Sequence, residues 1–265
     1  MYEAFWNLSQ SPFSANPDPR FYYRSFRHEE AINRLLYVIL AKNRAAGFLS
    51  GEVGSGKTLI CNILRTHPKL SNDKVLYVPS AFYSHTDFIK ELLLQCGIEY
   101  STDSKAELIR LLQNFLIQNV QKGKRTVIII DEAQAITDKQ VFEEIRLLLN
   151  LQFNNDFIMT LIFVGQPELS VLISNIPQLE QRISIRFHLT ALDLKETIEY
   201  VLYRLKIAGA RDPVFSKQAL DTIYEHTQGI PRKINNLCDL CMLAAYSQQT
   251  KTISSMLVKA VLDNY

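Results

Sequence analysis

Short apolar runs and amphipathic stretches alternate through the first 190 residues. Short apolar runs predict five strands, at 47–50, 74–79, 126–131, 159–164 and 183–189. The clearest is 126–131, which is uninterrupted and rich in β-branched residues, whereas 183–189 alternates in character. Apolar residues recurring at helical spacing predict helices at 28–42, 57–65, 86–95, 105–120 and 139–151. Because strands and helices alternate, we expect an α/β fold with a five-stranded parallel sheet.

The pattern changes after about residue 190, where helical periodicity continues without strands. Four helices are predicted, at 194–207, 216–227, 231–245 and 254–262. Pro231 suits a first helical turn, and Gly229 suits the C-cap that precedes it. We therefore predict two domains: an α/β nucleotide-binding core with an irregular N-terminal segment over 1–190, and a helical lid over 191–265.

The first 27 residues of the core are irregular. Pro12, Pro17 and Pro19 interrupt any helix, and aromatic residues are dense on both sides of them. Leaving so many aromatic side chains in water would be costly, so we expect this segment to pack onto a domain.

The glycine-rich run after the first strand carries the clearest chemistry. It matches the P-loop pattern G-x-x-x-x-G-K-[ST] between a predicted strand and helix, and it reads Gly51, Glu52, Val53, Gly54, Ser55, Gly56, Lys57 and Thr58. The glycines let backbone amides point at phosphate oxygens beside a helix N-terminus. Lys57 would reach the β- and γ-phosphates, and the Thr58 hydroxyl would bind Mg²⁺. We therefore expect ATP and Mg²⁺ as cofactors, with the binding run extending to Leu59.

Two carboxylates follow the most apolar strand. Asp131 ends the run Val127–Asp131, where a buried carboxylate is expensive unless a cation offsets it, and Glu132 is the next residue. We predict that Asp131 holds Mg²⁺ and that Glu132 is the general base for the attacking water. Together with the P-loop, this pair predicts ATP hydrolysis.

Four further polar residues are candidates for the reaction. Gln166 follows a predicted strand and would hold water or sense the γ-phosphate. Arg182 directly precedes the last predicted strand and Arg186 lies within it, and either one is a candidate arginine finger supplied to a neighbouring subunit. Arg232 begins a lid helix, an unfavourable place for a cation unless an anion lies nearby.

Composition excludes several other classes of protein. The formal net charge of +2 neither requires nor excludes a nucleic-acid partner. Four cysteines in 265 residues do not form a disulfide framework, and Cys238 and Cys241 are expected to face into a helix packing core. The chain opens without a signal peptide, and no apolar run reaches the roughly 18–20 residues that span a bilayer. We expect a cytoplasmic protein without a transmembrane segment.

These motifs together resemble the AAA+ ATPases, and within them the ExeA/GspA-type secretion ATPases near the Orc/Cdc6-like and TnsC-like branches. The resemblance covers nearly the whole chain. It is carried by the opening residues 2–7, 11–13 and 17–21, and by the runs at 27–32, 51–58, 130–134, 164–169, 179–183 and 229–235.

The resemblance assigns roles to residues of this sequence. It implies that Gln166 is sensor 1, that Arg232 is sensor 2, and that Arg27 and His28 lie where the N-terminal segment would approach the adenine. The region of Arg182 and Arg186 would supply the arginine finger, with Arg186 slightly less favoured. A finger supplied to a neighbour implies a homo-oligomer, either a ring or a filament.

Three cellular roles are compatible with these residues. The first is an ATPase whose cycle drives assembly or remodelling of a partner complex, as in secretion. Such a partner would place the protein peripherally at the inner membrane. The second is an ATP-dependent, DNA-binding regulator of a transposase. The third is a signalling ATPase that has neither partner.

Overall fold

The computed structural model describes residues 2–14, 18–41, 43–79 and 84–263. Pro17 of the N-terminal motif and Lys42, the last residue of the first predicted helix, lie outside these residues. The chain divides into two compact units. We call Met1–Arg27, Glu52–Leu59 and Thr190–Tyr265 the helical unit, and His28–Gly51 and Ile60–Leu189 the sheet unit.

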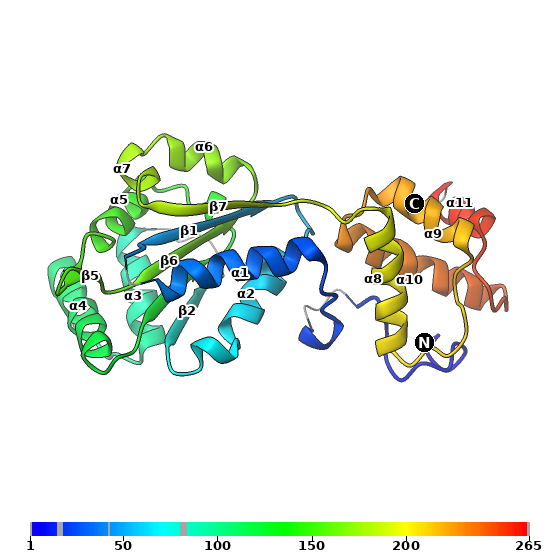
Figure 1. The fold of residues 1–265 in the computed structure, drawn as a ribbon, viewed down its shortest axis with the longest axis horizontal. Coiled ribbons are helices and arrows are strands. Elements are labelled where there is room, and N and C mark those ends of the chain that lie inside the picture. The colour runs from blue at the N-terminus through cyan, green and yellow to red at the C-terminus, as the bar shows by residue number, and fades with distance from the viewer. Residues whose placement is uncertain (1, 15–17, 42, 80–83, 264–265) are drawn as a thin grey trace. The chain divides into compact units, whose positions relative to one another are not determined.

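The sheet unit contains the predicted five-stranded parallel sheet (Figure 1). Its order is β2-β3-β6-β1-β7, with bounds β1 Ala46–Gly51, β2 Lys74–Val78, β3 Thr126–Ile130, β6 Thr160–Gly165 and β7 Ile183–Leu189. Every residue of the three central strands is buried, whereas both edge strands carry partly exposed residues. The uninterrupted apolar runs of the sequence are therefore the strands covered on both faces.

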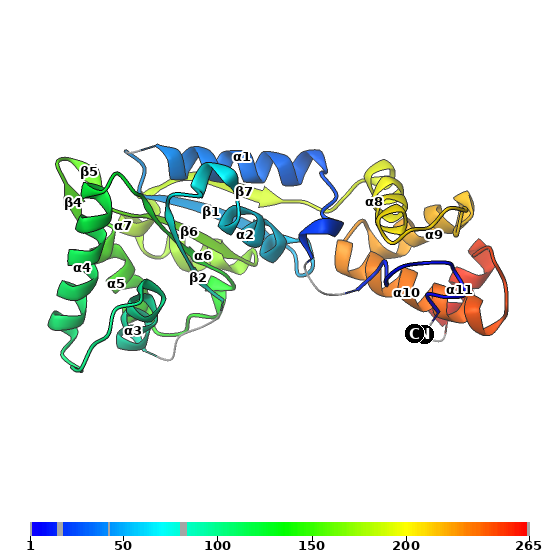
Figure 2. The same ribbon diagram turned by 90° about the horizontal axis from the view of Figure 1, so that it is seen from below.

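Helices cover both faces of this sheet. Their bounds are α1 Phe26–Leu40, α2 Lys57–Arg65, α3 His85–Cys96, α4 Lys105–Gln121, α5 Lys139–Leu148, α6 Glu168–Ser174 and α7 Pro177–Glu180. Figure 2 shows α1 on the side of the sheet opposite to α3 and α5. A Cβ atom on Gly47 would lie 3.1 Å from the Ile162 side chain and 3.4 Å from that of Leu35, so glycine allows α1 to pack closely there.

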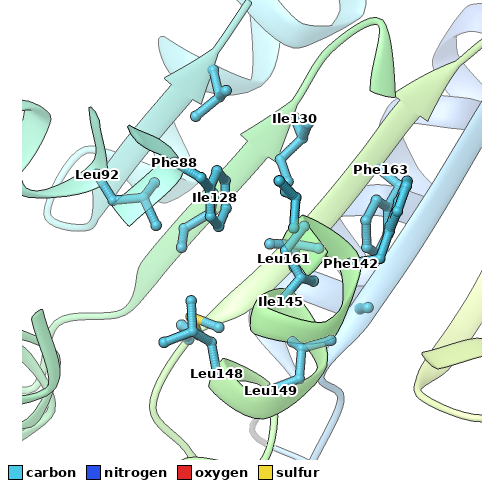
Figure 3. Packing of buried hydrophobic residues seen from close by; sticks show 14 of the residues in the cluster. Phe88, Leu92, Ile128, Ile130, Phe142, Ile145, Leu148, Leu149, Leu161 and Phe163 are labelled. Carbon is cyan, nitrogen blue, oxygen red and sulfur yellow. The ribbon is translucent and has the colours of Figure 1, made fainter. Parts of the chain in front are cut away.

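The core of the sheet unit lies between the sheet and α3, α4 and α5. Figure 3 shows Phe88 and Leu92 of α3 beside Ile128 of β3, and shows Leu161 and Phe163 of β6 beside side chains of α5. Because alternate residues of a strand face the same side, Ile128 and Ile130 point into this core together. The polar residues that follow β3 and β6 therefore lie at the ends of fully buried central strands.

Some elements were not expected from the sequence. A two-stranded hairpin joins β4 Gln152–Phe153 to β5 Asp156–Phe157, and α6 and α7 are short helices. The predicted helix 139–151 ends earlier, at Leu148, because the chain then turns into the hairpin. The part of the chain that the structure describes also contains 3₁₀ helices at Pro19–Phe21, Pro68–Leu70 and Ala133–Ala135.

The helical unit contains the four helices predicted after residue 190. They are α8 Leu194–Ile207, α9 Lys217–Thr227, α10 Pro231–Ser247 and α11 Ser255–Asp263. A capping box of Asp193 and Glu196 begins α8, and Pro231 occupies the first turn of α10. Cys238 and Cys241 are fully buried in this core, which confirms that they face inward.

The N-terminal segment packs in the helical unit, not in the unit of the sheet. Tyr2, Trp6, Phe13 and Phe21 are buried together with residues of α8 and α10. Buried Arg204 of α8 donates hydrogen bonds to the carbonyl oxygens of the segment at Pro12 (2.6 Å) and Ser14 (3.1 Å). The compact units thus differ from the predicted domains 1–190 and 191–265, because the N-terminal segment and the P-loop belong to the helical unit. The predicted domain boundary itself stays a prediction. Aromatic burial against α8 and α10 is the physical reason for the difference.

Candidate functional site

The P-loop follows directly from β1 and ends at the start of α2. Gly54 (φ 82°) and Gly56 (φ 105°) adopt left-handed backbone conformations that favour glycine, whereas Gly51 is the last residue of β1. Lys57 is buried, and its Nζ atom donates a hydrogen bond to the Glu52 carbonyl oxygen at 3.0 Å. The loop therefore curls around the lysine as a phosphate-binding loop requires.

The first turn of α10 packs against this loop within the helical unit. The backbone N–H of Arg232 donates a hydrogen bond to the Gly54 carbonyl oxygen at 3.2 Å. A Cβ atom on Gly54 would lie only 2.5 Å from the Cβ of Arg232, so only glycine allows this approach. The residue predicted as sensor 2 thus lies beside the predicted phosphate loop.

Asp131 follows the end of β3, in the sheet unit, and is buried with a relative accessibility of 2%. The Tyr77 hydroxyl of neighbouring β2 donates to its Oδ2 at 2.9 Å, and the backbone N–H of Glu132 donates to its Oδ1 at 2.9 Å. Burial, together with the nearby Asp131 carboxylate, raises the pKa of Tyr77, so its phenol stays protonated and remains a donor. The Arg65 guanidinium lies over the Tyr77 ring, 4.8 Å from its centroid.

Glu132 leaves the strand in an unusual conformation. Its backbone lies in the left-handed region at φ 50° and ψ 38°, which a residue with a Cβ atom rarely adopts. The amide of Gln134 donates to the Glu132 Oε2 atom at 2.5 Å, and the amide of Gln166 donates to the same atom at 3.4 Å. The Gln166 backbone N–H donates to the Gln134 Oε1 atom at 3.0 Å, which closes the network.

This network lies at one edge of the sheet. β3 and β6 are parallel neighbours, so Asp131, Glu132 and Gln166 follow carboxyl ends that meet at the same edge. Three residues predicted from the sequence are therefore brought together by the sheet unit. Tyr77 was not expected at this site, and Gln134 was expected only as part of the motif at 130–134.

Arg182 and Arg186 are held by partners within the sheet unit. Arg182 donates to the Asn150 Oδ1 atom at 2.5 Å, and its guanidinium lies 5.5 Å from the centroid of the Phe157 ring. Arg186 pairs with Glu180 at 3.1 Å. Arg182 precedes β7 and so lies at the amino edge of the parallel sheet, opposite to the edge that Asp131 follows.

The two residues predicted near the adenine begin α1. Arg27 is exposed, whereas His28 is buried with a relative accessibility of 5%. Arg27 belongs to the helical unit and His28 to the sheet unit.

The donor atoms at these positions fit Mg²⁺ better than a softer metal. Asp131 offers carboxylate oxygens and Thr58 a hydroxyl, which are the oxygen ligands that Mg²⁺ prefers. Among the described residues, no three histidine, cysteine or acidic side chains gather as a metal cluster. Burial raises the pKa of the Cys241 thiol to about 12, and that of Cys238 is also raised, so neither favours a metal-binding thiolate. A search of the described residues for a helix able to cross a membrane found none.

Comparison with known proteins connects this geometry to a family. The family described as "AAA domain" matches residues 40–173, just over half of the chain. General secretion pathway protein A of Aeromonas hydrophila is 34% identical over 259 residues, which are 96% of this chain and 46% of that protein. The chain thus spans about half the length of this relative.

Two solved structures show a similar fold at low identity. The ORC2 protein of Aeropyrum pernix, in ADPNP-ADP complexes, has a TM-score of 0.69 and 17% identity, over 96% of this chain and 71% of that one. Drosophila ORC bound to DNA has a TM-score of 0.66 and 15% identity, over 96% of this chain and 66% of that one. Their likeness concerns the fold alone.

Proposed function

We propose that this chain, which belongs to the AAA domain family of P-loop ATPases, binds ATP with Mg²⁺ and hydrolyses it. In this proposal, hydrolysis takes place in an oligomer and drives assembly or remodelling of a partner complex. The expected membership of the AAA+ ATPases is confirmed by the family match, and the likeness to the secretion type by the Aeromonas relative. One observation carries the chemical part. Besides the P-loop, the chain has a buried carboxylate at Asp131, directly followed by Glu132. The Glu132 carboxylate accepts hydrogen bonds from two side-chain amides.

The P-loop supplies the phosphate site in this proposal. Backbone amides of residues 51–59 and the N-terminus of α2 would hold phosphate oxygens, and Lys57 would leave the Glu52 carbonyl to bind the β- and γ-phosphates. Thr58 and Asp131 would hold Mg²⁺, which when bound neutralises charge on the phosphates. Arg232 would contact the γ-phosphate from the first turn of α10, and Arg27 and His28 would approach the adenine.

The remaining residues act on water and on the developing charge. Glu132 would accept a proton from the attacking water as general base, and Gln166 would hold that water or sense the γ-phosphate. Arg182 lies at the amino edge of its own sheet, which favours a role toward a second copy of the chain. Arg186 is the second candidate for this finger, so the proposed active form is a ring or filament.

Lys57→Ala tests the phosphate-binding part of the proposal. Removing a buried cation that would make charge-assisted hydrogen bonds to two phosphates should weaken ATP binding by about 100-fold. The affinity is measured by titration calorimetry with ATP and Mg²⁺. Lys69→Ala, which removes an exposed lysine of the 3₁₀ helix Pro68–Leu70, is the matched control and should bind ATP as the wild type does. Equal affinity of Lys57→Ala and wild type would exclude this phosphate site.

The partner is proposed from the likeness to General secretion pathway protein A, and DNA is the alternative partner. Support for DNA comes from the fold alone, through the likeness to Drosophila ORC bound to DNA. The proposed location is the cytoplasm, and a partner in the inner membrane would hold the protein at that membrane. The four free cysteine thiols are consistent with a reducing compartment.

Duplex-DNA binding separates these partners. It is measured with ATP, ADP or no nucleotide at several salt concentrations, beside the mass of the oligomer. The secretion-like role predicts weak DNA association that is insensitive to salt. ATP-dependent oligomers on duplex DNA, with affinity falling steeply as salt rises, would instead support the transposase regulator.

A further inference from the structure

We infer that Gln134 is a positioning residue for ATP hydrolysis, which holds the Glu132 carboxylate and ties it to the residue at the sensor-1 position. The inference rests on the proposed function, because it assumes that Glu132 is the general base. Gln134, two residues after Glu132, had no role of its own in the proposed function. Gln134 lies in the 3₁₀ helix Ala133–Ala135 and is partly buried.

The orientation of the Gln134 amide is fixed by its surroundings. A backbone N–H can only donate, so the N–H of Gln166, 3.0 Å away, requires the Oε1 atom of Gln134 on that side. The Nε2 donor of the same amide must then face the Glu132 carboxylate, where the distance to Oε2 is 2.5 Å. The reversed amide would place a donor against a donor and an oxygen against a carboxylate. The bridge therefore has one stable orientation.

The chain is shaped to admit this amide. Gly165 ends β6 directly before Gln166, and a Cβ atom there would lie 2.5 Å from the Gln134 Oε1 atom. Any larger residue would push the amide away from the Gln166 N–H. The need to leave room for the Gln134 amide therefore explains why a glycine precedes Gln166.

The bridge also explains how Glu132 keeps its strained backbone. A left-handed conformation at a residue with a Cβ atom is strained and persists only where the surroundings hold it. Both side-chain hydrogen bonds to Glu132 end on Oε2, from Gln134 and from Gln166. The inference assigns Oε1 to the water, with Oε2 as the anchored oxygen.

Movement at β6 would be transmitted through the same bridge. Because Gln134 bonds the backbone of Gln166 and the side chain of Glu132, a shift of Gln166 toward a γ-phosphate would move the anchored carboxylate with it. Sensing and base positioning are therefore coupled through one glutamine.

Two substitutions separate the role of the amide from that of its bulk. Gln134→Met keeps a straight side chain of similar length and removes both hydrogen bonds. Gln134→Glu keeps an oxygen that accepts from the Gln166 N–H but turns a second oxygen toward the Glu132 carboxylate. Gln118→Glu, on the exposed side of α4, adds the same charge away from the site and serves as the matched control.

The test compares ATP affinity with turnover at saturating ATP. We expect both Gln134 variants to bind ATP within about twofold of wild type and to lose about 10- to 100-fold in kcat, the cost of a base that is no longer held in place. Gln118→Glu should retain the wild-type kcat. The melting temperature of each variant is measured alongside, so that loss of fold is distinguished from loss of positioning.

A double-mutant comparison tests whether Gln134 acts through Glu132. If it does, Glu132→Gln combined with Gln134→Met is no slower than Glu132→Gln alone. Additive losses, or a wild-type kcat in both Gln134 variants, would overturn the inference while leaving the ATPase intact. Absence of hydrolysis in the wild-type chain would instead overturn the proposed function.

Discussion

The carboxylates of Asp131 and Glu132 are adjacent in the chain but are held by different kinds of group. Asp131 is buried and accepts from a phenol and a backbone amide, a rigid arrangement suited to a constant ligand. Glu132 is partly buried and accepts from two side-chain amides, those of Gln134 and Gln166. In the proposed function, the metal ligand and the general base are therefore held by separate sets of donors.

Tyr77→Phe tests the support of Asp131 at the scale of one residue. Without the hydroxyl, a buried carboxylate loses a donor, while the ring keeps its packing under Arg65. We expect a loss of about 1–2 kcal/mol in the free energy of unfolding and a several-fold higher Mg²⁺ concentration for half-maximal ATPase activity. Denaturant titration and Mg²⁺ titration measure the two quantities.

Tyr37→Phe is the control for this prediction. Tyr37 is exposed, and its hydroxyl accepts a hydrogen bond from Arg44 at 3.1 Å. Its loss should change neither the Mg²⁺ requirement nor the stability by more than about 0.5 kcal/mol. An unchanged Mg²⁺ requirement in Tyr77→Phe would show that the phenol does not position the carboxylate.

At the scale of elements, long periodic segments were predictable and short ones were not. The five strands were expected because a strand buried on both faces is a continuous apolar run. The four C-terminal helices were expected because a helix buried along one side has apolar residues at helical spacing. The two-residue strands of the β4–β5 hairpin are too short for any period. Their turn did leave a trace, since Asn154 and Asn155 both adopt positive φ, as asparagine pairs in hairpins do.

The candidate site was predictable only as far as local motifs reach. The P-loop and the Asp131–Glu132 pair are contiguous in sequence, so their chemistry could be inferred without knowing the sheet order. Tyr77 and Gln134 act across β2–β3 and β3–β6 contacts, which depend on strand pairings that skip through the sequence. Periodicity contains no information on which strands are neighbours, so these two roles required the structure.

Gly54→Ala tests the packing of the α10 helix on the P-loop. A new Cβ atom would be strained at φ 82° and would also collide with Arg232. Gly209→Ala, in the same unit, has similar strain at φ 98°, but its nearest atom is 3.6 Å away. We expect urea unfolding to show a loss of about 1 kcal/mol for Gly209→Ala and at least about 2 kcal/mol for Gly54→Ala. Equal losses would mean that the helix does not pack on the loop.

At the scale of the whole molecule, the residues assigned to ATP belong to both compact units. The P-loop and Arg232 are in the helical unit, and Asp131, Glu132 and Gln166 are in the sheet unit. In the proposed function, the phosphate-binding residues therefore come from the helical unit and the residues that act on water come from the sheet unit. Arg182, at the amino edge of the sheet, is the residue proposed to act toward a neighbouring copy.

The most direct test is ATP turnover by Glu132→Gln, measured as phosphate release at saturating ATP and Mg²⁺ beside ATP binding. The substitution keeps the size of the side chain and removes the base. ATP affinity should stay within about threefold of wild type, while phosphate release should fall by about 100- to 10,000-fold. Phosphate release at the wild-type rate would contradict the assignment of Glu132 and the mechanism built on it.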